Sequence, residues 1–318
     1  MKILLSAVLL CASMAHAQDY PTKPIRMLVP FAPGGAVDTT ARVLAQAMTQ
    51  RLNWQFVVEN RPGGNGFIAT TAVKSAPPDG YTLLMAHTGE FAVNPALFSN
   101  VPYELERDFI PVTMVSDAPM LYLASAKAPF NSFAELVAQA KAKPGSISFG
   151  SAGNGSINHL AGEWLAQAAG IQLLHVPYKG GAPAAAAVAA GDVHFGVMAV
   201  PGAMPHIKSG RGKVIGITTA KKSPLDGSWA TPRDAGIPDL DASIWVGLFA
   251  PKGTPQPVVD KLNAEVRKTL AEPDVQKRFV ESGGAEAIGM SSAEFLARVK
   301  KDLERYRTVI KAAGVKAD

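Results

Sequence analysis

The feature that most constrains this chain is a repeated change from an apolar strand-like run, through glycines, into a helical pattern. Residues 29–48 read VPFAPGGAVDTTARVLAQAM, and residues 146–170 repeat the change in SISFGSAGNGSINHLAGEWLAQAAG. Alternation of strands and helices predicts α/β layers with mostly parallel strands. At 318 residues and 47% hydrophobic composition, the chain can bury two cores. We therefore expect an α/β protein of two lobes, with a helical stretch after residue 255.

The first residues are typical of an export signal. Lys2 precedes an apolar run over residues 3–12, and an Ala-His-Ala site ends at Ala17. Cleavage there would remove residues 1–17 and leave an exported protein. The single cysteine, Cys11, lies inside this leader after Leu10, so neither a disulfide nor a lipid anchor is expected in the mature chain.

The charge pattern argues against nucleic acid as a partner. The formal net charge is +5, and loss of Lys2 with the leader would leave +4. No Lys/Arg cluster interleaved with aromatic residues accompanies this mild excess. An anionic small molecule suits such a chain better.

Both glycine turns are candidates for binding an anion. Pro33, Gly34 and Gly35 precede one helical pattern, and Gly155 and Ser156 precede the other. A helix start carries free backbone N–H groups and a favourable dipole, and glycine lets a ligand approach the main chain. Two such turns facing each other would hold an anion between them. The alternative is that both are ordinary connections in which glycine supplies a positive φ.

Side chains beside the turns have two interpretations each. Asp38 could contact a ligand through water or an amino group, or it could only stabilise the helix dipole. Ser156 could cap its helix, bind a ligand through its hydroxyl, or do both. His159 and Glu163 are four residues apart, which favours a helix pair over a metal site because no third ligand is spaced nearby. We expect no bound metal.

Known catalytic and cofactor motifs fit poorly. Gly153 and Gly155 are followed by Asn158 where a dinucleotide-binding turn needs its third glycine. Neither turn leads into a phosphate-binding lysine, and Phe149 stands where a nucleophile elbow before Ser151 needs glycine. We expect no cofactor and no enzymatic activity.

Several segments in order resemble the Bug family, the periplasmic substrate-binding proteins of tripartite tricarboxylate transporters. They are PFAPGGAVDTTARVLAQAM, VVENRPGGNGFIATTAVKSAPPDGYTLLM, VNPALF, SFGSAGNGSINHLAGE, HVPYKGGAPA, MPHIKSG and GLFAPKGTP. The resemblance covers the whole mature chain. It implies a two-lobed type II periplasmic-binding-protein fold, the Venus flytrap, with a ligand cleft between lobes. Lobe 1 would hold residues 18–120 plus 240–318, and lobe 2 residues 121–239.

The resemblance also implies where a ligand carboxylate lies. It would be held between the first turn and the second, with a third segment before NPAL and a fourth before the MPHIKSG segment. His87 departs from the small hydroxyl residues of the family at the third segment, and Met198 stands where aspartate is common in the fourth. Alternatively, His87 is a solvated loop residue and Met198 a core residue. The implied ligand-binding residues are Pro33, Gly34, Gly35, Asp38, His87, Thr88, Ser151, Asn154, Gly155, Ser156, His159 and Met198.

The function implied is a monomeric receptor that captures an organic carboxylate and delivers it to the membrane subunits of the transporter. Met198 offers no counter-charge, so we expect an aromatic or medium-chain acid to bind better than aspartate, glutamate or citrate. A sensory receptor with the same pocket is one alternative. A secreted enzyme that uses Ser151, His159 and Asp38 is another.

Overall fold

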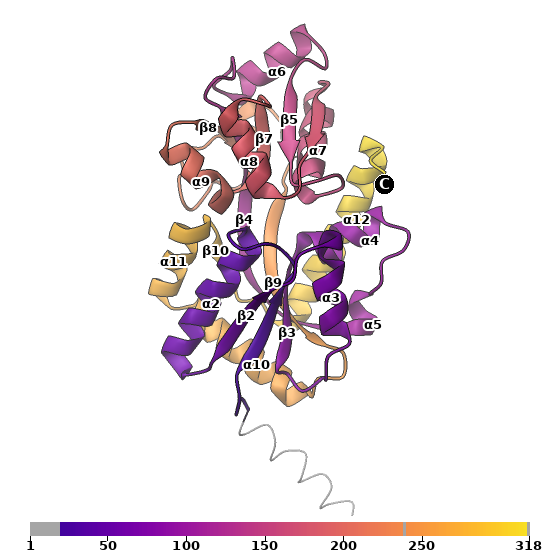
Figure 1. Ribbon diagram of the computed structural model, residues 1–318, viewed down its shortest axis with the longest axis vertical. Helices are drawn as coiled ribbons and strands as arrows, with labels where there is room; N and C mark the ends of the chain where they lie inside the picture. Colours follow the sequence, from indigo (N-terminus) through magenta and orange to yellow (C-terminus); the bar gives the residue numbers. More distant parts are fainter. Residues whose placement is uncertain (1–19, 238–239, 317–318) are drawn as a thin grey trace, which may run out of the picture.

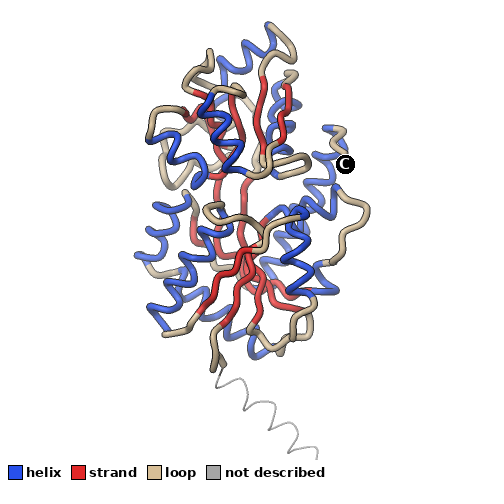
Figure 2. Tube along the Cα trace, in the orientation of Figure 1, coloured by secondary structure: helices blue, strands red, loops and turns tan. Residues whose placement is uncertain are grey.

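Two layered bodies stand one above the other along the long axis of the computed structural model, joined by the strands β4 (Phe109–Ser125) and β9 (Ser243–Pro251) (Figure 1). The structure describes residues 20–237 and 240–316, so the predicted leader lies outside the described residues. Figure 2 shows strands in the middle of each body with helices on their outer sides. Within the described ranges, no helix has the length and apolar character to span a membrane.

The lower body, here called lobe 1, is built on the sheet order β2-β1-β3-β9-β4. Strand β1 (Ile25–Val29) runs parallel to β2 (Phe56–Asn60) and β3 (Thr82–His87), whereas β9 runs antiparallel to β3 and β4. The other elements are α2 (Ala36–Leu52), η1 (Gly64–Gly66), α3 (Phe67–Lys74), η2 (Gly89–Val93), α4 (Asn94–Leu97), α5 (Leu105–Asp108), α10 (Gln256–Leu270), α11 (Pro273–Gly283), β10 (Glu286–Ala287) and α12 (Ser292–Ala313).

The upper body, lobe 2, repeats the strand and helix alternation on the order β4-β7-β5-β6, with β8 (Gly212–Ile217) also pairing with β4. Strand β5 (Ser148–Ser151) runs parallel to β6 (Leu174–Pro177) and β7 (Phe195–Ala199). The helices are α6 (Phe133–Ala142), α7 (Ile157–Ala169), α8 (Gly181–Ala190) and α9 (Val200–Lys208), and a short turn η3 (Arg233–Ala235) follows β8.

Strand β4 belongs to both sheets. Its residues 109–119 pair with β9, and residues 120–125 pair with β7 and β8. The change of partner at residue 120 supports our proposal that lobe 1 comprises residues 18–120 and 240–318 and that lobe 2 comprises residues 121–239.

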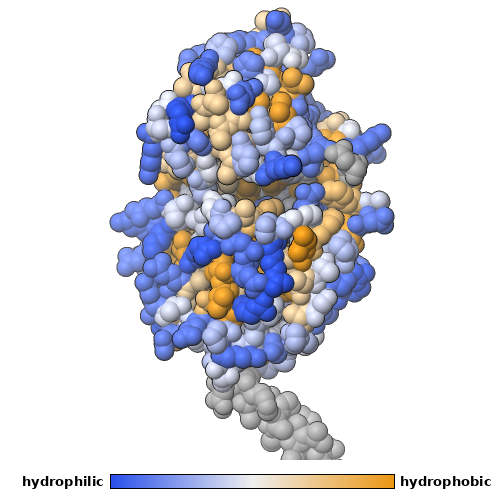
Figure 3. Space-filling view, in the orientation of Figure 1, coloured by the Kyte–Doolittle hydropathy of each residue, from blue (hydrophilic) through white to orange (hydrophobic). Residues whose placement is uncertain are grey.

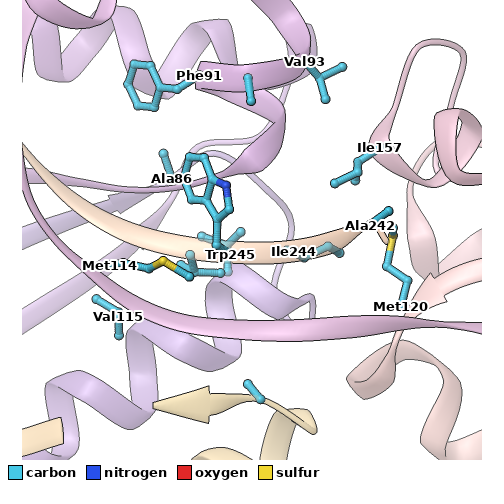
Figure 4. Close-up of a cluster of buried hydrophobic side chains, with 14 of the residues drawn as sticks. Ala86, Phe91, Val93, Met114, Val115, Met120, Ile157, Ala242, Ile244 and Trp245 are labelled. Carbon is cyan, nitrogen blue, oxygen red and sulfur yellow. The ribbon is translucent and has the colours of Figure 1, made fainter. Parts of the chain in front are cut away.

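The apolar core is continuous along these connecting strands. In Figure 4, Trp245 stands on β9 with Ile244 beside it, while Met114 and Val115 lie on β4. Trp245 is fully buried, and its indole N–H donates to Asp302 of α12 at 2.9 Å. A buried indole needs such a partner. Trp245 thereby ties α12 to the strands that join the lobes.

Candidate functional site

The two glycine turns lie at the same level of the molecule, where the lobes meet. The first follows the carboxyl end of β1, the second follows that of β5, and the two strands point toward each other from opposite lobes (Figure 1). In open parallel sheets, ligands bind outside the carboxyl ends of the strands. Figure 3 shows the surface hollowed between the lobes on this face.

An acidic side chain holds the first turn in shape. Gly34 has φ +86°, and its N–H donates to Asp38 Oδ2 at 2.9 Å. Asp38 is buried, and it also accepts hydrogen bonds from Arg42 and Asn60. Burial raises the pKa of Asp38, but the hydrogen bonds from Arg42, Gly34 and Asn60 outweigh it and hold that pKa below its usual range. Its carboxylate is thus engaged within the turn, and direct contact with a ligand stays a prediction.

Gly35 is the open position of the first turn. It begins α2 in an extended conformation, φ −83° and ψ 176°, with no side-chain cap. A Cβ at this position would meet only the carbonyl oxygen of Ala32, at 3.9 Å. Pro33 and Gly34 are exposed. The backbone of the first turn is therefore accessible at the start of a helix of 17 residues.

The second turn is closed by its own hydrogen bonds. Ser156 is the N-cap of α7, accepting the His159 N–H at 3.2 Å and donating to the Gly153 carbonyl at 2.7 Å. The capping interpretation of Ser156 is therefore correct. The Gly155 N–H donates to His159 Nδ1 at 3.1 Å, and Leu97 of lobe 1 lies against Gly155. Asn154 is half-buried in the same turn.

Two stacked histidines form hydrogen bonds with the second turn. The rings of His159 and His175 lie 3.7 Å apart with an angle of 8° between their planes. His175 Nε2 is 2.7 Å from Oγ of the buried Ser151, and His159 Nε2 is 3.4 Å from Glu163. Burial, and secondly the neighbouring His159, lower the pKa of His175 to about 4. His175 was not among the residues expected at the site, because its only signal in the sequence was its place in a strand-like run.

The third segment places His87 against the first turn. Its ring lies 4.6 Å from the ring of Phe31, and its Nδ1 lies 2.7 Å from Oε2 of the buried Glu90. Thr88 is buried, and its hydroxyl accepts a hydrogen bond from the main-chain N–H of Trp245 at 3.1 Å. The same hydroxyl lies 3.3 Å from the Ser243 carbonyl. Thr88 therefore bonds to the connecting strand β9, and its contact with a ligand stays a prediction.

Met198 occupies the interior of lobe 2. Its side chain is 1% exposed and belongs to an apolar cluster with Leu121, Val188 and Ile217. This is the core position that the alternative interpretation predicted. A ligand contact through Met198 stays a prediction.

The residues proposed for an enzymatic alternative are not assembled into catalytic machinery. Ser151 bonds to His175, while His159 bonds to Gly155 and Asp38 bonds to Arg42 in the other lobe. A hydrolytic triad needs nucleophile, base and acid in one hydrogen-bonded chain. Across the part of the chain that the structure describes, no group of three acidic, histidine or cysteine side chains could hold a metal.

A second polar cluster lies where β4, β9 and α12 meet. Arg298 contacts Asp117 at 3.3 Å and Asp302 at 2.8 Å, beside a depression of about 210 Å³ that Lys221 also lines. Burial raises the pKa of Asp117, although Arg298 opposes the shift. The cluster joins the connecting strands to α12 and contains no residue of either glycine turn.

Residues 40–315 match the family model described as "Tripartite tricarboxylate transporter family receptor". The chain belongs to this family. The receptor is 33% identical to BugT of Bordetella pertussis over 96% of its own length and 94% of that protein. Two solved structures superpose over almost the whole receptor. "R. palustris Rpa4515 with adipate" has a TM-score of 0.89 at 32% identity, covering 94% of the receptor and 99% of that chain. MatC from Rhodopseudomonas palustris with bound malate has a TM-score of 0.81 at 31% identity, covering 92% and 100%.

The receptor thus has the two-lobed periplasmic-binding-protein fold that its sequence motifs indicated, and its membership of the Bug family is confirmed. Glu90 and His175 lie near the turns in unusual environments. Neither was predicted from the sequence as a site residue. Glu90 stands three residues after His87, a spacing that brings two side chains together once the strand leads into a helical turn.

Proposed function

We propose that the receptor binds an organic carboxylate in the periplasm between the two glycine turns and delivers it to the membrane subunits of a tripartite transporter. The observation that carries this proposal is that two helix starts, those of α2 and α7, follow the carboxyl ends of β1 and β5 on the facing sides of the two lobes. Both helix dipoles favour a negative charge at the junction of the lobes. The receptor acts as a monomer without cofactor, and it binds no nucleic acid.

Main-chain N–H groups, not side-chain cations, hold the carboxylate in this proposal. Residues 31–35 and 151–156 contain no Lys or Arg, and the nearby Arg42 is paired with Asp38. Delivery requires reversible binding, so we expect a Kd in the micromolar range, about −8 kcal/mol. Closure of the lobes removes water and strengthens these hydrogen bonds.

The ligand class is a mono- or dicarboxylic acid. Related receptors were solved with adipate and with malate, which are both dicarboxylates. Adipate is the better first candidate because its aliphatic chain gains from burial, at roughly 25 cal/mol per Å². We expect adipate to outcompete aspartate and citrate.

Titration calorimetry on residues 18–318 with adipate, malate, aspartate and citrate tests the proposal. Gly35→Val should abolish binding, because the branched side chain would stand over the backbone N–H groups at the start of α2. Its fold should be unchanged, because Gly35 has an extended φ and free space around it. Ser156→Ala should cost about 1.5–3 kcal/mol of binding if the ligand carboxylate takes the hydroxyl hydrogen that the Gly153 carbonyl accepts in this structure.

Gly227→Val is the matched control. Gly227 is exposed, no atom lies within 4 Å of a Cβ built there, and it belongs to neither turn. Wild-type affinity in Gly35→Val would remove the first turn from the site. Failure of every carboxylate to bind the wild-type protein would refute the function itself. Uptake of the bound acid by cells that contain the membrane subunits separates delivery to a transporter from sensing.

A further inference from the structure

Two buried glycines of the receptor are each in contact with an apolar side chain from the opposite lobe. Gly284 of lobe 1 follows α11, and Val200 of lobe 2 lies against it. Gly155 of lobe 2 belongs to the second turn, and Leu97 of lobe 1 lies against it. The helices α11 and α4, which end at these contacts, stand on opposite sides of lobe 1 (Figure 1). The lobes therefore meet through two reciprocal contacts, one on each side of the junction.

The contact at Gly284 leaves no room for a side chain. A Cβ at Gly284 would lie 2.8 Å from Cγ2 of Val200, 3.1 Å from its Cγ1 and 3.2 Å from its Cβ. Because all three atoms are close and valine in a helix keeps one strongly preferred rotamer, rotation of the side chain would not relieve the overlap. Val200 is the first residue of α9, is 1% exposed and belongs to the apolar cluster of lobe 2. An added Cβ would therefore act on the position of α9 itself.

The same contact lies close to the first turn. Thr39 of α2 is 4.0 Å from a Cβ built on Gly283, and its main-chain N–H donates to the Gly35 carbonyl at 2.9 Å. On the other lobe, Val200 directly follows β7, which pairs in parallel with β5, the strand that leads into the second turn. The contact between Val200 and Gly284 thus links the start of α2 to the strand edge that carries the second turn.

The contact at Gly155 is made on the second turn itself. A Cβ at Gly155 would lie 2.2 Å from Cδ2 of Leu97 but 3.6 Å from its Cγ. Leu97 is the last residue of α4, and Asn94 fixes this helix to lobe 1 by donating to the Asn65 carbonyl at 2.8 Å. The tip of a leucine can rotate away from a new neighbour, so this contact is easier to rearrange than that of Val200.

We propose that Val200 and Leu97 are positioning residues that set the ligand affinity from outside the ligand site. By packing on Gly284 and Gly155, they hold the two glycine turns at the separation at which one carboxylate reaches both. The inference rests on the proposed function. A ligand that needs both turns binds only molecules in which the lobes are together, so its apparent affinity falls with the fraction of such molecules. Loss of either contact lowers that fraction without removing a group that touches the ligand.

Gly284→Ala is the decisive variant. Its methyl group cannot fit against Val200, so we expect the lobes to stand apart and adipate affinity to fall about tenfold or more. Val200→Ala alone should weaken binding by about threefold, because it only removes the packing. The double variant should bind adipate more tightly than Gly284→Ala, because loss of both Cγ atoms makes room for the added methyl group. A purely structural effect predicts the reverse, since two destabilising changes in one protein add up.

The separation of the lobes can be measured directly. Residues 18–318 contain no cysteine, so spin labels can be attached at Lys141→Cys on α6 and Lys277→Cys on α11. Both lysines are exposed, one on each lobe. In the protein without ligand, the distance between the labels should be longer with Gly284→Ala than in the otherwise wild-type chain. Adipate at saturation should shorten it again.

Gly170→Ala is the matched control. Gly170 follows α7 at φ +61° and Gly284 follows α11 at φ +62°, so both changes place alanine in the same left-handed conformation after a helix. No atom of the described residues lies within 4 Å of a Cβ built on Gly170. Gly170→Ala should therefore carry the same backbone strain but keep wild-type affinity and label distance. Leu97→Ala, which changes no glycine, should weaken adipate binding by about threefold.

Wild-type adipate affinity in Gly284→Ala would overturn the inference while leaving the function intact. Weaker binding that Val200→Ala does not improve, or that comes with a wild-type label distance, would overturn it as well. Wild-type affinity in Leu97→Ala would remove Leu97 from the inference. Absence of all carboxylate binding in the wild-type protein would instead refute the function.

Discussion

At the scale of single residues, the environment of a side chain decides between two roles that its type alone allows. Asp38 and Ser156 both stand at helix starts, and both are used to shape their turns, through the Gly34 N–H and the His159 N–H. Such bonds fix the backbone of the two turns at which we propose that a ligand binds. Met198 is buried and His175 is half-buried, and at both positions a change of charge alters the free energy of unfolding.

Met198→Asp should destabilise the receptor by about 2–5 kcal/mol. The change removes packing from the apolar cluster around Leu121 and buries a carboxylate without a partner. Urea denaturation of the mature protein measures it. Leu174→Asp, at a side chain 56% exposed, is the control and should change stability by less than about 0.5 kcal/mol. Unchanged stability together with altered ligand preference would restore Met198 to the cleft wall.

The half-buried His175 should make the free energy of unfolding fall with acid. Its pKa of about 4 in the folded protein lies below the unfolded value of 6.5, so the unfolded chain binds more protons between these values. Stability is therefore complete above about pH 6.5 and is lost as the pH falls, by about 1 kcal/mol between pH 7 and pH 5 once solvent screening of this half-buried ring is allowed for. Urea denaturation at both pH values, compared with His175→Gln, measures the difference. An equal loss in the variant would assign the effect to other groups.

At the scale of elements, local signals define the helices while the strands that join the lobes depend on long-range pairing. The helix α12 begins with a capping box, in which Ser291 accepts the Glu294 N–H and Glu294 accepts the Ser291 N–H. A cap of this kind satisfies donors that the helix itself leaves free. Strand β4 instead takes both its length and its partners from two different sheets.

Ser291→Ala should cost about 1 kcal/mol of stability, because it removes the N-cap acceptor of α12. The helix carries Arg298 and Asp302, which join it to Trp245 and β4, so its first turn is coupled to the connecting strands. Thermal denaturation measures the loss. Ser291→Asp preserves an acceptor and should retain most of the stability, and an equal loss in both variants would contradict a capping role.

At the scale of the whole molecule, the structure shows the lobes in contact on both sides of the turns. Helices α2 and α11 of lobe 1 touch α9 of lobe 2, and Val200 lies against Gly284. On the other side α12 contacts α7, where the guanidinium of Arg305 lies 4.6 Å from the ring centre of Trp164. Separation of the lobes would break both sets of contacts.

Carboxylate binding should therefore change the fluorescence of Trp164. If the ligand favours the closed form, it brings Arg305 over the indole and alters its surroundings. Titration of the wild-type receptor with adipate should give a saturable signal. That signal should be lost in Trp164→Phe and kept in Trp54→Phe, because Trp54 packs on Tyr20 within lobe 1. A signal that survives in Trp164→Phe would show that this contact does not report closure.

Local patterns of the sequence were enough to predict the α/β class, the two glycine turns and the helical end. Strand runs, glycines and helix caps act over a few residues, so they can be read without knowledge of the fold. The motifs in their order also indicated the family, which the comparison confirmed.

What the sequence by itself determined about this protein is thus the identity and order of its elements and the positions of the two glycine turns. Only the tertiary structure brought Asp38 to Asn60, stacked His159 on His175, and buried Glu90 completely. It also joined residues 111–115 and 120–125, which form separate apolar runs in the sequence, into the single strand β4. Local patterns act over one or two turns of chain, whereas burial and the pairing of charges depend on distant segments that meet only when the sheets assemble.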